Sequence, residues 1–320
     1  MKERLKQLCD QFLAAKAGIK DVFGMEYDEI YTLCANMLVS RGKLPDAAVL
    51  RRCRELLKTK AGIFSSFRGT MEAPVCCLMS VADEPEQKFA RIEKAHSVLK
   101  RHFGDSQYLV YASAVLSDMP TEIVEGVSAR ARNIYDLMKR RHPFLTSYED
   151  HVFCVLLAMS ERSDEELISE TEQIYKSLNL SDSNTMQSVS HILALAEGDP
   201  AEKCDILKGI FNGLKEVGKK YGTYGELAVL AALAAVSPDI TDAVTDIADA
   251  DDYLSLNKEY RGFFNCGEHT RLMHAALITA ASYAPVGSDI SGTLPMIAAE
   301  DALLYIYDAS SDTMVMMTTM

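Results

Sequence analysis

The sequence lacks tryptophan, has few glycines and prolines, and contains no long apolar run. With 17 Gly and nine Pro in 320 residues, it is too poor in both to be a disordered chain or a β-protein rich in turns. The longest strongly apolar stretch, "LAVLAALAAV" at 227–236, is about half as long as the roughly 20 residues of a membrane-spanning helix. We therefore expect a folded protein that does not enter a membrane and, by default, is cytoplasmic.

Sequence signatures of catalysis and cofactor binding are also missing. There is no G-x-x-x-x-G-K-[ST], no G-x-G-x-x-G and no G-x-S-x-G. The eight cysteines show neither C-x-x-C nor zinc-finger spacing, and most fall on apolar helical stripes, as buried thiols of a reducing compartment do. His269 and His274 are five positions apart, not the four of an H-E-x-x-H zinc site. The sequence predicts no cofactor, metal or disulfide, and leaves enzymatic activity uncertain but disfavoured.

Charge is negative overall and uneven along the chain. The net charge of −13 opposes broad contact with nucleic acid, whose phosphates repel carboxylates. Residues 1–60 hold 12 Lys/Arg against 8 Asp/Glu, whereas residues 226–320 hold 3 against 14. The acidic C-terminal part would suit a basic partner, but a solvated acidic face is the favoured interpretation.

Helical periodicity runs through almost the whole sequence, and one pattern recurs. An apolar segment ends in a small residue, a turn with acidic residues or proline follows, and then comes an amphipathic segment. The residues before the turns are Ser40, Ala82, Ser117, Ser160, Ala196 and Val236. Their spacing near 40 residues predicts an all-α fold of α–α hairpins stacked as a degenerate HEAT-like solenoid. The alternative is an irregular helical bundle.

The clearest break in the pattern is "PVGSDISGTLP" at 285–295, with two Pro and two Gly. The expected organisation is therefore a helical hairpin array over 1–284 and a loop over 285–295. Residues 296–320 should form a C-terminal helix and an apolar tail, "MVMMTTM", packed on the array.

The stretch "HPFLTSYEDHV" at 142–152 raises the question of a histidine site. Either Thr146 with Glu149 or Ser147 with Asp150 fits a capping box at a helix start. Alignment of Ser160 with Ala196 brings the polar sides of two neighbouring helices together. We expect one shared surface for a small polar ligand or a peptide, formed by Asp150, His151, Asn184, Gln187 and His191. The favoured alternative is a polar, solvated face.

Two further segments carry basic residues. Arg68, in "SSFRGT", is suited to bidentate binding of a carboxylate or phosphate, or to an ion pair with Glu72. The segment "RARNIYDLMKRRH" at 130–142 would bind nucleic acid or an acidic peptide, but a solvated helix with a basic last turn is favoured.

At "FSSFRGT", "HPFLTSYEDHVFCVLLA" and "TMQSVSHILAL" the chain resembles an uncharacterised bacterial family, filed as domain of unknown function 4003. The likeness spans most of residues 10–310. It implies a cytoplasmic helical protein of unassigned function and transfers no catalytic residue.

Two hypotheses about function follow from the sequence. The first is a non-enzymatic helical-repeat scaffold that offers a curved surface to a peptide or protein partner. The alternative is a small-ligand-binding or hydrolytic enzyme that uses Asp150, His151 and His191, with Arg68 as a further binding residue.

Overall fold

The structure, a computed structural model, describes residues 1–24, 28–236, 239–261, 267–283, 294 and 297–307. These residues form helices, turns and loops and contain no β-strand, so the all-α prediction is confirmed. The chain divides into two compact units. The first unit comprises Met1–Phe12 and Glu165–Ala302, and the second comprises Leu13–Asp164 and Leu303–Met320. Helix α1 (Glu3–Phe23) contributes residues to both.

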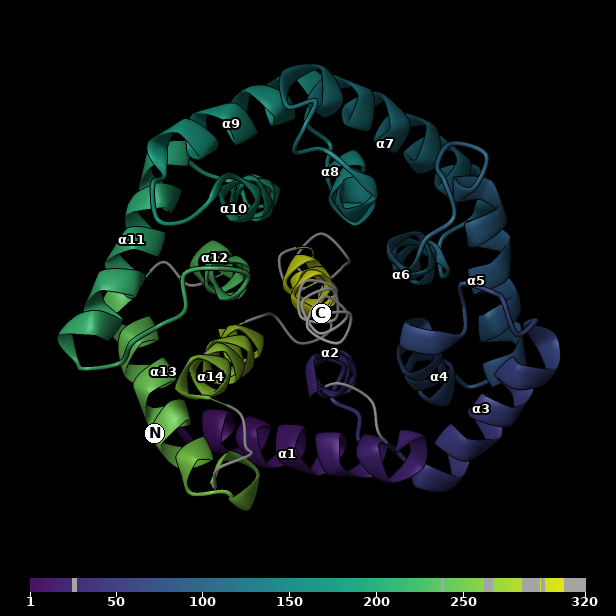
Figure 1. Cartoon of the computed structure of the whole chain (residues 1–320), viewed down its shortest axis with the longest axis horizontal. Coiled ribbons are helices and arrows are strands. Elements are labelled where there is room, and N and C mark those ends of the chain that lie inside the picture. The colour runs from purple at the N-terminus through teal and green to yellow at the C-terminus, as the bar shows by residue number, and fades with distance from the viewer. Residues whose placement is uncertain (25–27, 237–238, 262–266, 284–293, 295–296, 308–320) are drawn as a thin grey trace, which may run out of the picture. The chain divides into compact units, whose positions relative to one another are not determined.

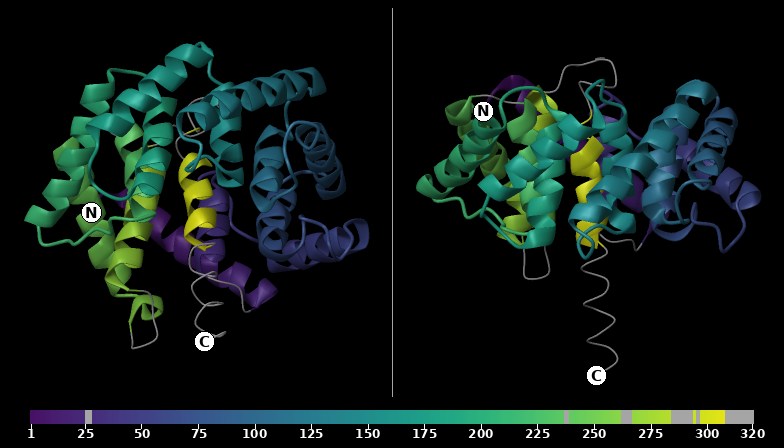
Figure 2. Two further views of the ribbon diagram at one scale, coloured as in Figure 1. Left: turned by 45° about the horizontal axis from the view of Figure 1, so that its top comes forward. Right: turned by 90° about the horizontal axis from the view of Figure 1, so that it is seen from above.

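The second unit consists of two rows of helices. The buried row contains α2 (Asp28–Val39), α4 (Glu72–Ser80), α6 (Gln107–Leu116) and α8 (His151–Ala158). The surface row contains α3 (Ala47–Lys60), α5 (Pro85–Leu99) and α7 (Thr121–Arg141). In Figure 1 the helices of the buried row are seen nearly end-on, and those of the surface row are seen from the side. The helix axes of the two rows therefore cross steeply, as the views in Figure 2 also show.

Sequence composition explains which helix joins which row. Every residue of α8 is buried, and its sequence, HVFCVLLA, is apolar around almost the whole circumference. Such a helix can be stable only when it is covered on all sides. Helix α7 instead buries a single stripe, which includes Val124, Ala131, Ile134 and Met138, and exposes its polar face.

The predicted turns coincide with the C-terminal ends of three helices of the buried row. Helices α2, α6 and α8 end at Val39, Leu116 and Ala158, within two residues of the predicted Ser40, Ser117 and Ser160. The following helices begin with the predicted signals: Asp46 accepts hydrogen bonds from the backbone of Ala48 and Val49, and proline occupies the first turn of α5. The first N–H groups of a helix have no intrahelical acceptor, so a cap such as Asp46 can bind them and a proline, which lacks an N–H, is tolerated there.

Packing of the helix pairs differs from the predicted hairpins. In the second unit, each of α3, α5 and α7 is joined to the helix before it by a short turn and to the helix after it by a longer loop. Each packs more extensively against the helix after it than against the helix before it. A short turn joins helices that diverge at once because the rows cross steeply, whereas a longer loop lets the chain fold back over the surface helix. The stacking of the pairs as a HEAT-like solenoid stays a prediction.

Arg130 of α7 joins the surface row to the end of α8. Its guanidinium donates to the Oδ1 atom of Asp164 at 2.7 Å and to the carbonyl of Ala158 at 3.1 Å. It also donates to the carbonyls of Ser160 and Arg162. One side chain thus satisfies the last carbonyl of α8, which the helix leaves without an intrahelical donor, and two carbonyls of the turn that follows.

The first unit repeats the two-row arrangement. Its buried helices are α10 (Ser183–Leu195), α12 (Glu226–Val236) and α14 (Glu268–Tyr283), and its more exposed helices are α9 (Asp164–Ser177), α11 (Pro200–Glu216) and α13 (Ile240–Ser255). Asp199 and Asp239 accept hydrogen bonds from the first turns of α11 and α13. The predicted starts of these second helices are therefore confirmed.

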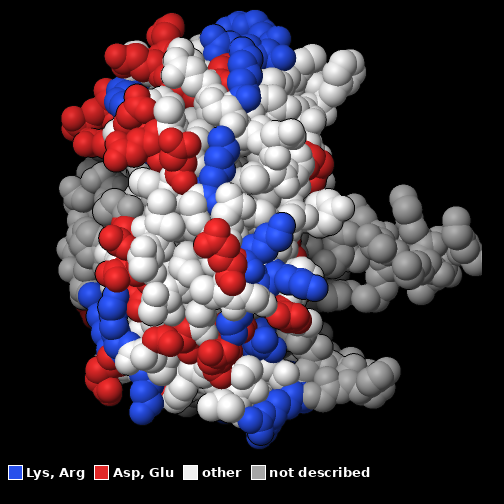
Figure 3. All heavy atoms as spheres, turned by 90° about the vertical axis from the view of Figure 1, so that its left-hand side faces the viewer, with Lys and Arg blue, Asp and Glu red and all other residues white. Residues whose placement is uncertain are grey.

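The acidic residues of α13 are largely used inside the first unit. Buried Asp251 accepts from Lys219 at 2.7 Å and from Arg271 at 2.6 Å. Asp246 accepts from Lys2 at 2.8 Å and from the hydroxyl of Tyr283 at 2.7 Å. On the side where α11 lies, Figure 3 shows basic side chains interspersed among acidic ones, with a larger acidic group near the top of the view. Asp246 and Asp251 thus serve intramolecular pairing, whereas the side chains of Asp242 and Asp252 are 63% and 74% exposed.

Two glycines let α11 approach α13 closely. A Cβ atom at Gly209 would lie 2.5 Å from Cδ1 of Ile240, and one at Gly213 would lie 2.7 Å from Cγ2 of Val244. Glycine is otherwise unfavourable inside a helix by about 1 kcal/mol relative to alanine. The close packing of α11 against α13 explains why both positions hold glycine although alanine is the better helix former.

The glycines of α11 therefore give a test of this packing. We expect the pair Gly209→Ala and Gly213→Ala to lower the free energy of unfolding by about 1 kcal/mol or more, because overpacking outweighs the gain in helix propensity. Gly126→Ala in α7, where nothing lies within 4 Å of the added Cβ, should instead raise it by about 1 kcal/mol. Urea denaturation measures both, and stabilisation by the double substitution would refute the close approach.

The C-terminal predictions are only partly within the described residues. Residues 297–307 are helical, and Glu300 and Asp301 within them are buried. The predicted loop over 285–295 lies outside the described residues except for Leu294, which is helical, and so does the apolar tail. No helix in the described ranges is both long and apolar enough to cross a membrane.

Candidate functional site

The residues predicted to form one polar surface are divided between the two units. Asp150 and His151 lie in the second unit, as does Arg68, whereas Asn184, Gln187 and His191 lie in the first. The shared surface therefore stays a prediction, and each group is described within its own unit.

Asp150 has the structural role that the capping-box pattern predicts. Its Oδ2 atom accepts from the backbone N–H of Ser147 at 2.8 Å, while Oγ of Ser147 accepts from the N–H of Glu149. The cap precedes a 3-10 turn at Tyr148–Asp150, and α8 begins at His151. Burial raises the pKa of the Asp150 carboxyl to about 7, although the bond from Ser147 opposes this shift.

His151 lies in a cluster of aromatic rings. Its ring centroid is 4.6 Å from that of Phe103 and 5.5 Å from that of Tyr135. The guanidinium of Arg132 lies 5.9 and 5.2 Å from the centroids of the same two rings, a cation–π geometry. Among the described residues, the buried Nδ1 atom of His151 has no hydrogen-bond partner.

This environment favours the neutral imidazole. Burial, with a smaller contribution from Arg132, lowers the pKa of His151 to about 4. His151 and Asp150 are 5% and 6% exposed. The interpretation of these two residues as a polar, solvated face is therefore wrong, because α8 is covered on the side that carries them.

The three predicted residues of α10 occupy two different environments. Asp182 caps the helix by accepting from the N–H of Thr185 at 3.0 Å, and Asn184 is exposed in the first turn. Gln187 and His191 are both buried. Within α10, only Asn184 of the three predicted residues faces solvent.

Arg68 is engaged by a neighbouring carboxylate. Its Nε atom donates to Oε2 of Glu72 at 2.8 Å, and Nε of Arg54 donates to Oε1 of the same carboxylate at 2.6 Å. Although burial opposes the shift, these two bonds hold the pKa of Glu72 below its usual value. The ion pair that the sequence allowed as the alternative for Arg68 is confirmed.

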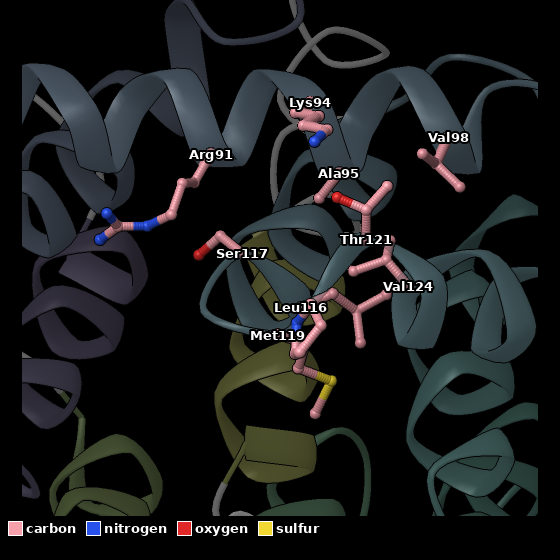
Figure 4. Close-up of a pocket in the computed structure, with 10 residues that line it drawn as sticks. Arg91, Lys94, Ala95, Val98, Leu116, Ser117, Met119, Thr121 and Val124 are labelled. Atoms are coloured by element: carbon pink, nitrogen blue, oxygen red, sulfur yellow. The ribbon is translucent and has the colours of Figure 1, made fainter.

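A pocket that the sequence did not predict lies where α5 meets the turn between α6 and α7. Its volume is about 180 Å³. Figure 4 shows Arg91, Lys94 and Val98 along α5, with Leu116, Met119 and Val124 opposite them. The remaining lining residues are Ala95, Ser117, Pro120 and Thr121. The surface is thus mainly apolar with two cations, and none of the ten lining residues is Asp or Glu.

A second, larger pocket of about 460 Å³ shares Arg91 with the first. It is also lined by Asp118 and by Lys88, whose Nζ atom donates to Oγ of Ser117 at 2.8 Å and to Oδ2 of Asp118 at 2.6 Å. Burial lowers the pKa of Lys88, and Asp118 opposes that shift. The other lining residues are Arg41, Leu78, Val81, Ala82, Asp83, Glu84 and Gln87. We call the two pockets together the turn groove.

The turn groove could not be found from the periodicity. The periodicity predicts that α5 and α7 begin soon after the turns at Ala82 and Ser117, and they do, but the pocket depends on how α5 packs against α7. The usable signal was the spacing of Arg91, Lys94, Ala95 and Val98, which places two cations beside apolar residues on one helical face.

Comparison with known proteins places the chain in a family. A family model described as "Protein of unknown function (DUF4003)" matches residues 17–293. The chain belongs to this family. The resemblance found at its motifs is thus confirmed. No curated protein and no solved structure matches the chain.

The DUF4003 match includes the whole turn groove and all six predicted site residues. The family description states no activity. Among the described residues, no group of three or more His, Cys, Asp or Glu side chains is placed to hold a metal ion.

Seven cysteines within the DUF4003 chain, Cys9, Cys34, Cys53, Cys76, Cys77, Cys154 and Cys204, are buried free thiols. Cys266 lies outside the described residues.

Proposed function

We propose that this DUF4003 protein is a helical scaffold that binds a segment of a partner protein in the turn groove. The observation that supports this most is the composition of the smaller pocket, which combines an apolar floor with two cations and no carboxylate. A pocket of that composition suits an apolar side chain with a carboxylate beside it. The partner segment should therefore carry a large apolar residue flanked by Asp or Glu.

The exposed cation Lys94 should contribute most directly to that selectivity. Arg91 already has a carboxylate nearby, because its Nη2 atom donates to Oδ1 of Asp118 at 3.3 Å. Lys94 is exposed at the pocket, and a carboxylate of the partner would approach it without displacing an internal ion pair of the described structure. The apolar floor supplies affinity through burial, while the cation favours an acidic neighbour.

Synthetic peptides test the proposal. Fluorescein-labelled peptides with one Leu or Phe flanked by Asp and Glu should bind, as measured by fluorescence anisotropy. Matched peptides with Lys and Arg at the flanks, or with Ser in place of the apolar residue, should bind at least about tenfold more weakly, a difference of about 1.4 kcal/mol. Lys94→Glu should weaken binding of the acidic peptides by a similar factor.

The matched control is Lys215→Glu in α11, an exposed lysine of the other unit that undergoes the same change of charge. Its effect on binding should be within about twofold, because it is outside the turn groove. Equal binding of acidic and basic peptides, or equal effects of the two substitutions, would contradict the proposal.

The second candidate function is the small-ligand or hydrolytic site at Asp150 and His151. One observation favours it: adjacent buried groups have pKa values displaced to about 7 and about 4, and displaced pKa values are frequent at functional sites. The cap formed by Asp150 and the ring packing of His151 already account for both environments, so we place this function second.

A further inference from the structure

Exposed charges of opposite sign lie in the two pockets of the turn groove. In the smaller pocket, Lys94 is exposed. In the larger pocket, the side chains of Asp83 and Glu84 are exposed. Asp83 and Glu84 come immediately before α5, and Lys94 lies within that helix. The sign of the exposed charge therefore changes along one helix.

The cations that line the larger pocket have partners within the second unit. Lys88 and Arg91 donate to different carboxylate oxygens of Asp118, at 2.6 and 3.3 Å. Arg41 donates to the carbonyl of Met37 at 2.6 Å, near the C-terminal end of α2, where the helix dipole is negative. The positive charge of this pocket is thus largely compensated within the unit.

The carboxylates of Asp83 and Glu84 are not used in this way. Within the residues that the structure describes, neither side chain makes a hydrogen bond or an ion pair. Glu84 precedes α5 as its cap residue, but its side chain accepts no cap hydrogen bond. The larger pocket, at about 460 Å³, also has more room for a long side chain than the smaller one. Both carboxylates are therefore available to a cation of a partner.

The separation of these charges sets a spacing on the partner. Lys94 is ten positions after Glu84, and a helix rises about 1.5 Å per residue, so the two positions lie about 15 Å apart along α5. An extended segment covers about 3.3 Å per residue and spans that length in about four or five residues. Figure 4 shows the side chain of Arg91, which both pockets share, extended along α5 away from Lys94 and Val98.

We propose that the partner segment, in addition to its apolar and acidic residues, carries a Lys or Arg that binds Asp83 and Glu84 in the larger pocket. This inference rests on the proposed function of the turn groove. The apolar side chain occupies the smaller pocket and the acidic residue faces Lys94. The basic residue lies four or five positions from the acidic one in an extended segment. Charge complementarity at both ends of the groove then fixes the direction in which the segment binds.

Peptides with and without the basic residue test the spacing. Each fluorescein-labelled peptide keeps one Leu flanked by Asp and has Arg four or five positions before or after the Asp, and matched peptides have Gln in place of that Arg. In one of the two directions, Arg should tighten binding about fivefold, as measured by fluorescence anisotropy. Arg placed ten positions from the Asp should give no gain.

Substitutions in the full chain assign the gain to the larger pocket. Asp83→Asn with Glu84→Gln should abolish the difference in affinity between the Arg and Gln peptides. The matched control, Glu202→Gln with Asp205→Asn at exposed positions of α11 in the other unit, should preserve it. Asp83→Lys with Glu84→Lys should reverse the preference, so that a peptide with Glu in place of the Arg binds more tightly. Because all four carboxylates are exposed, circular dichroism should show an unchanged fold.

The outcomes separate this inference from the proposed function. If the Arg and Gln peptides bind equally while Lys94→Glu still weakens both, the proposed function stands and the basic residue of the partner is refuted. An equal gain at every spacing, or a gain that Asp83→Asn with Glu84→Gln leaves in place, would show only a general attraction to an acidic chain and would also overturn the inference. If no acidic peptide binds, both proposals fall.

Discussion

Replacement of Arg130 by Met is expected to lower the free energy of unfolding by about 3 kcal/mol, one of the two largest effects we predict. Removal of one partner from a largely buried charged network leaves the other groups without compensation. Here the groups left behind are the carboxylate of Asp164 and the carbonyls of Ala158, Ser160 and Arg162. Asn133, which donates to Asp164 at 2.5 Å, would offset only part of the loss.

Urea denaturation followed by circular dichroism measures this effect as a lower midpoint at an unchanged slope. Arg101→Met is the matched control, because Arg101 and its partner Glu125 are both more than half exposed and surface ion pairs contribute little. Its effect should stay below about 0.5 kcal/mol. Equal effects of the two substitutions would show that Arg130 is not the link between α7 and the end of α8.

The second large effect is a pair of opposite pH dependences at Asp150 and His151. The pKa of Asp150 is raised in the fold to about 7, so its contribution to stability is complete below about pH 4 and is lost as pH rises through 7. The pKa of His151 is lowered to about 4, so its contribution is complete above about pH 6.5 and is lost as pH falls through 4. Between pH 4 and 6.5 the two contributions oppose each other.

Single substitutions should separate the two contributions. In Asp150→Asn, which keeps an oxygen to accept from Ser147, stability should rise more steeply with pH between 4 and 6.5 than in the unsubstituted protein. In His151→Phe, which keeps a ring beside Phe103 and Tyr135, stability should fall as pH rises through the same range. Each difference should reach about 3 kcal/mol at most.

The measurement is the free energy of unfolding as a function of pH for all three proteins. The other titratable groups near the site, such as Tyr135, Asp136 and Cys154, are common to all of them, so the differences report Asp150 and His151. Two difference curves of the same sign would contradict the assignment of the pKa shifts.

Local signals in the sequence predicted the helix starts well, because they depend on neighbouring residues alone. The cap at Asp46, the proline in the first turn of α5 and the capping box of Ser147 with Asp150 are all present. Each satisfies backbone N–H groups within its own turn. The division of the chain into helices could therefore be predicted from the sequence.

The surroundings of the site residues could not be predicted in the same way. The helical periodicity assigns His151 to a polar side of its helix, but Phe103, from the turn between α5 and α6, and Tyr135 of α7 cover it. The pocket at Arg91 and Lys94 likewise depends on the approach of α7 to α5. Periodicity tells which side of a helix is apolar, not which distant residue covers the other side.

Both units combine separated segments of the chain, but the first unit takes in the N-terminal turns of α1. Asp10 accepts a hydrogen bond from the hydroxyl of Tyr253 at 2.6 Å, and Phe12 lies against His274 at 5.6 Å between ring centroids. The first unit therefore cannot close until the ribosome has completed α13 and α14, whereas α2 to α8 of the second unit follow one another without interruption. During synthesis the N-terminal turns of α1 must wait for the most distant part of their own unit, and contacts of such long sequence separation are the slow ones to form.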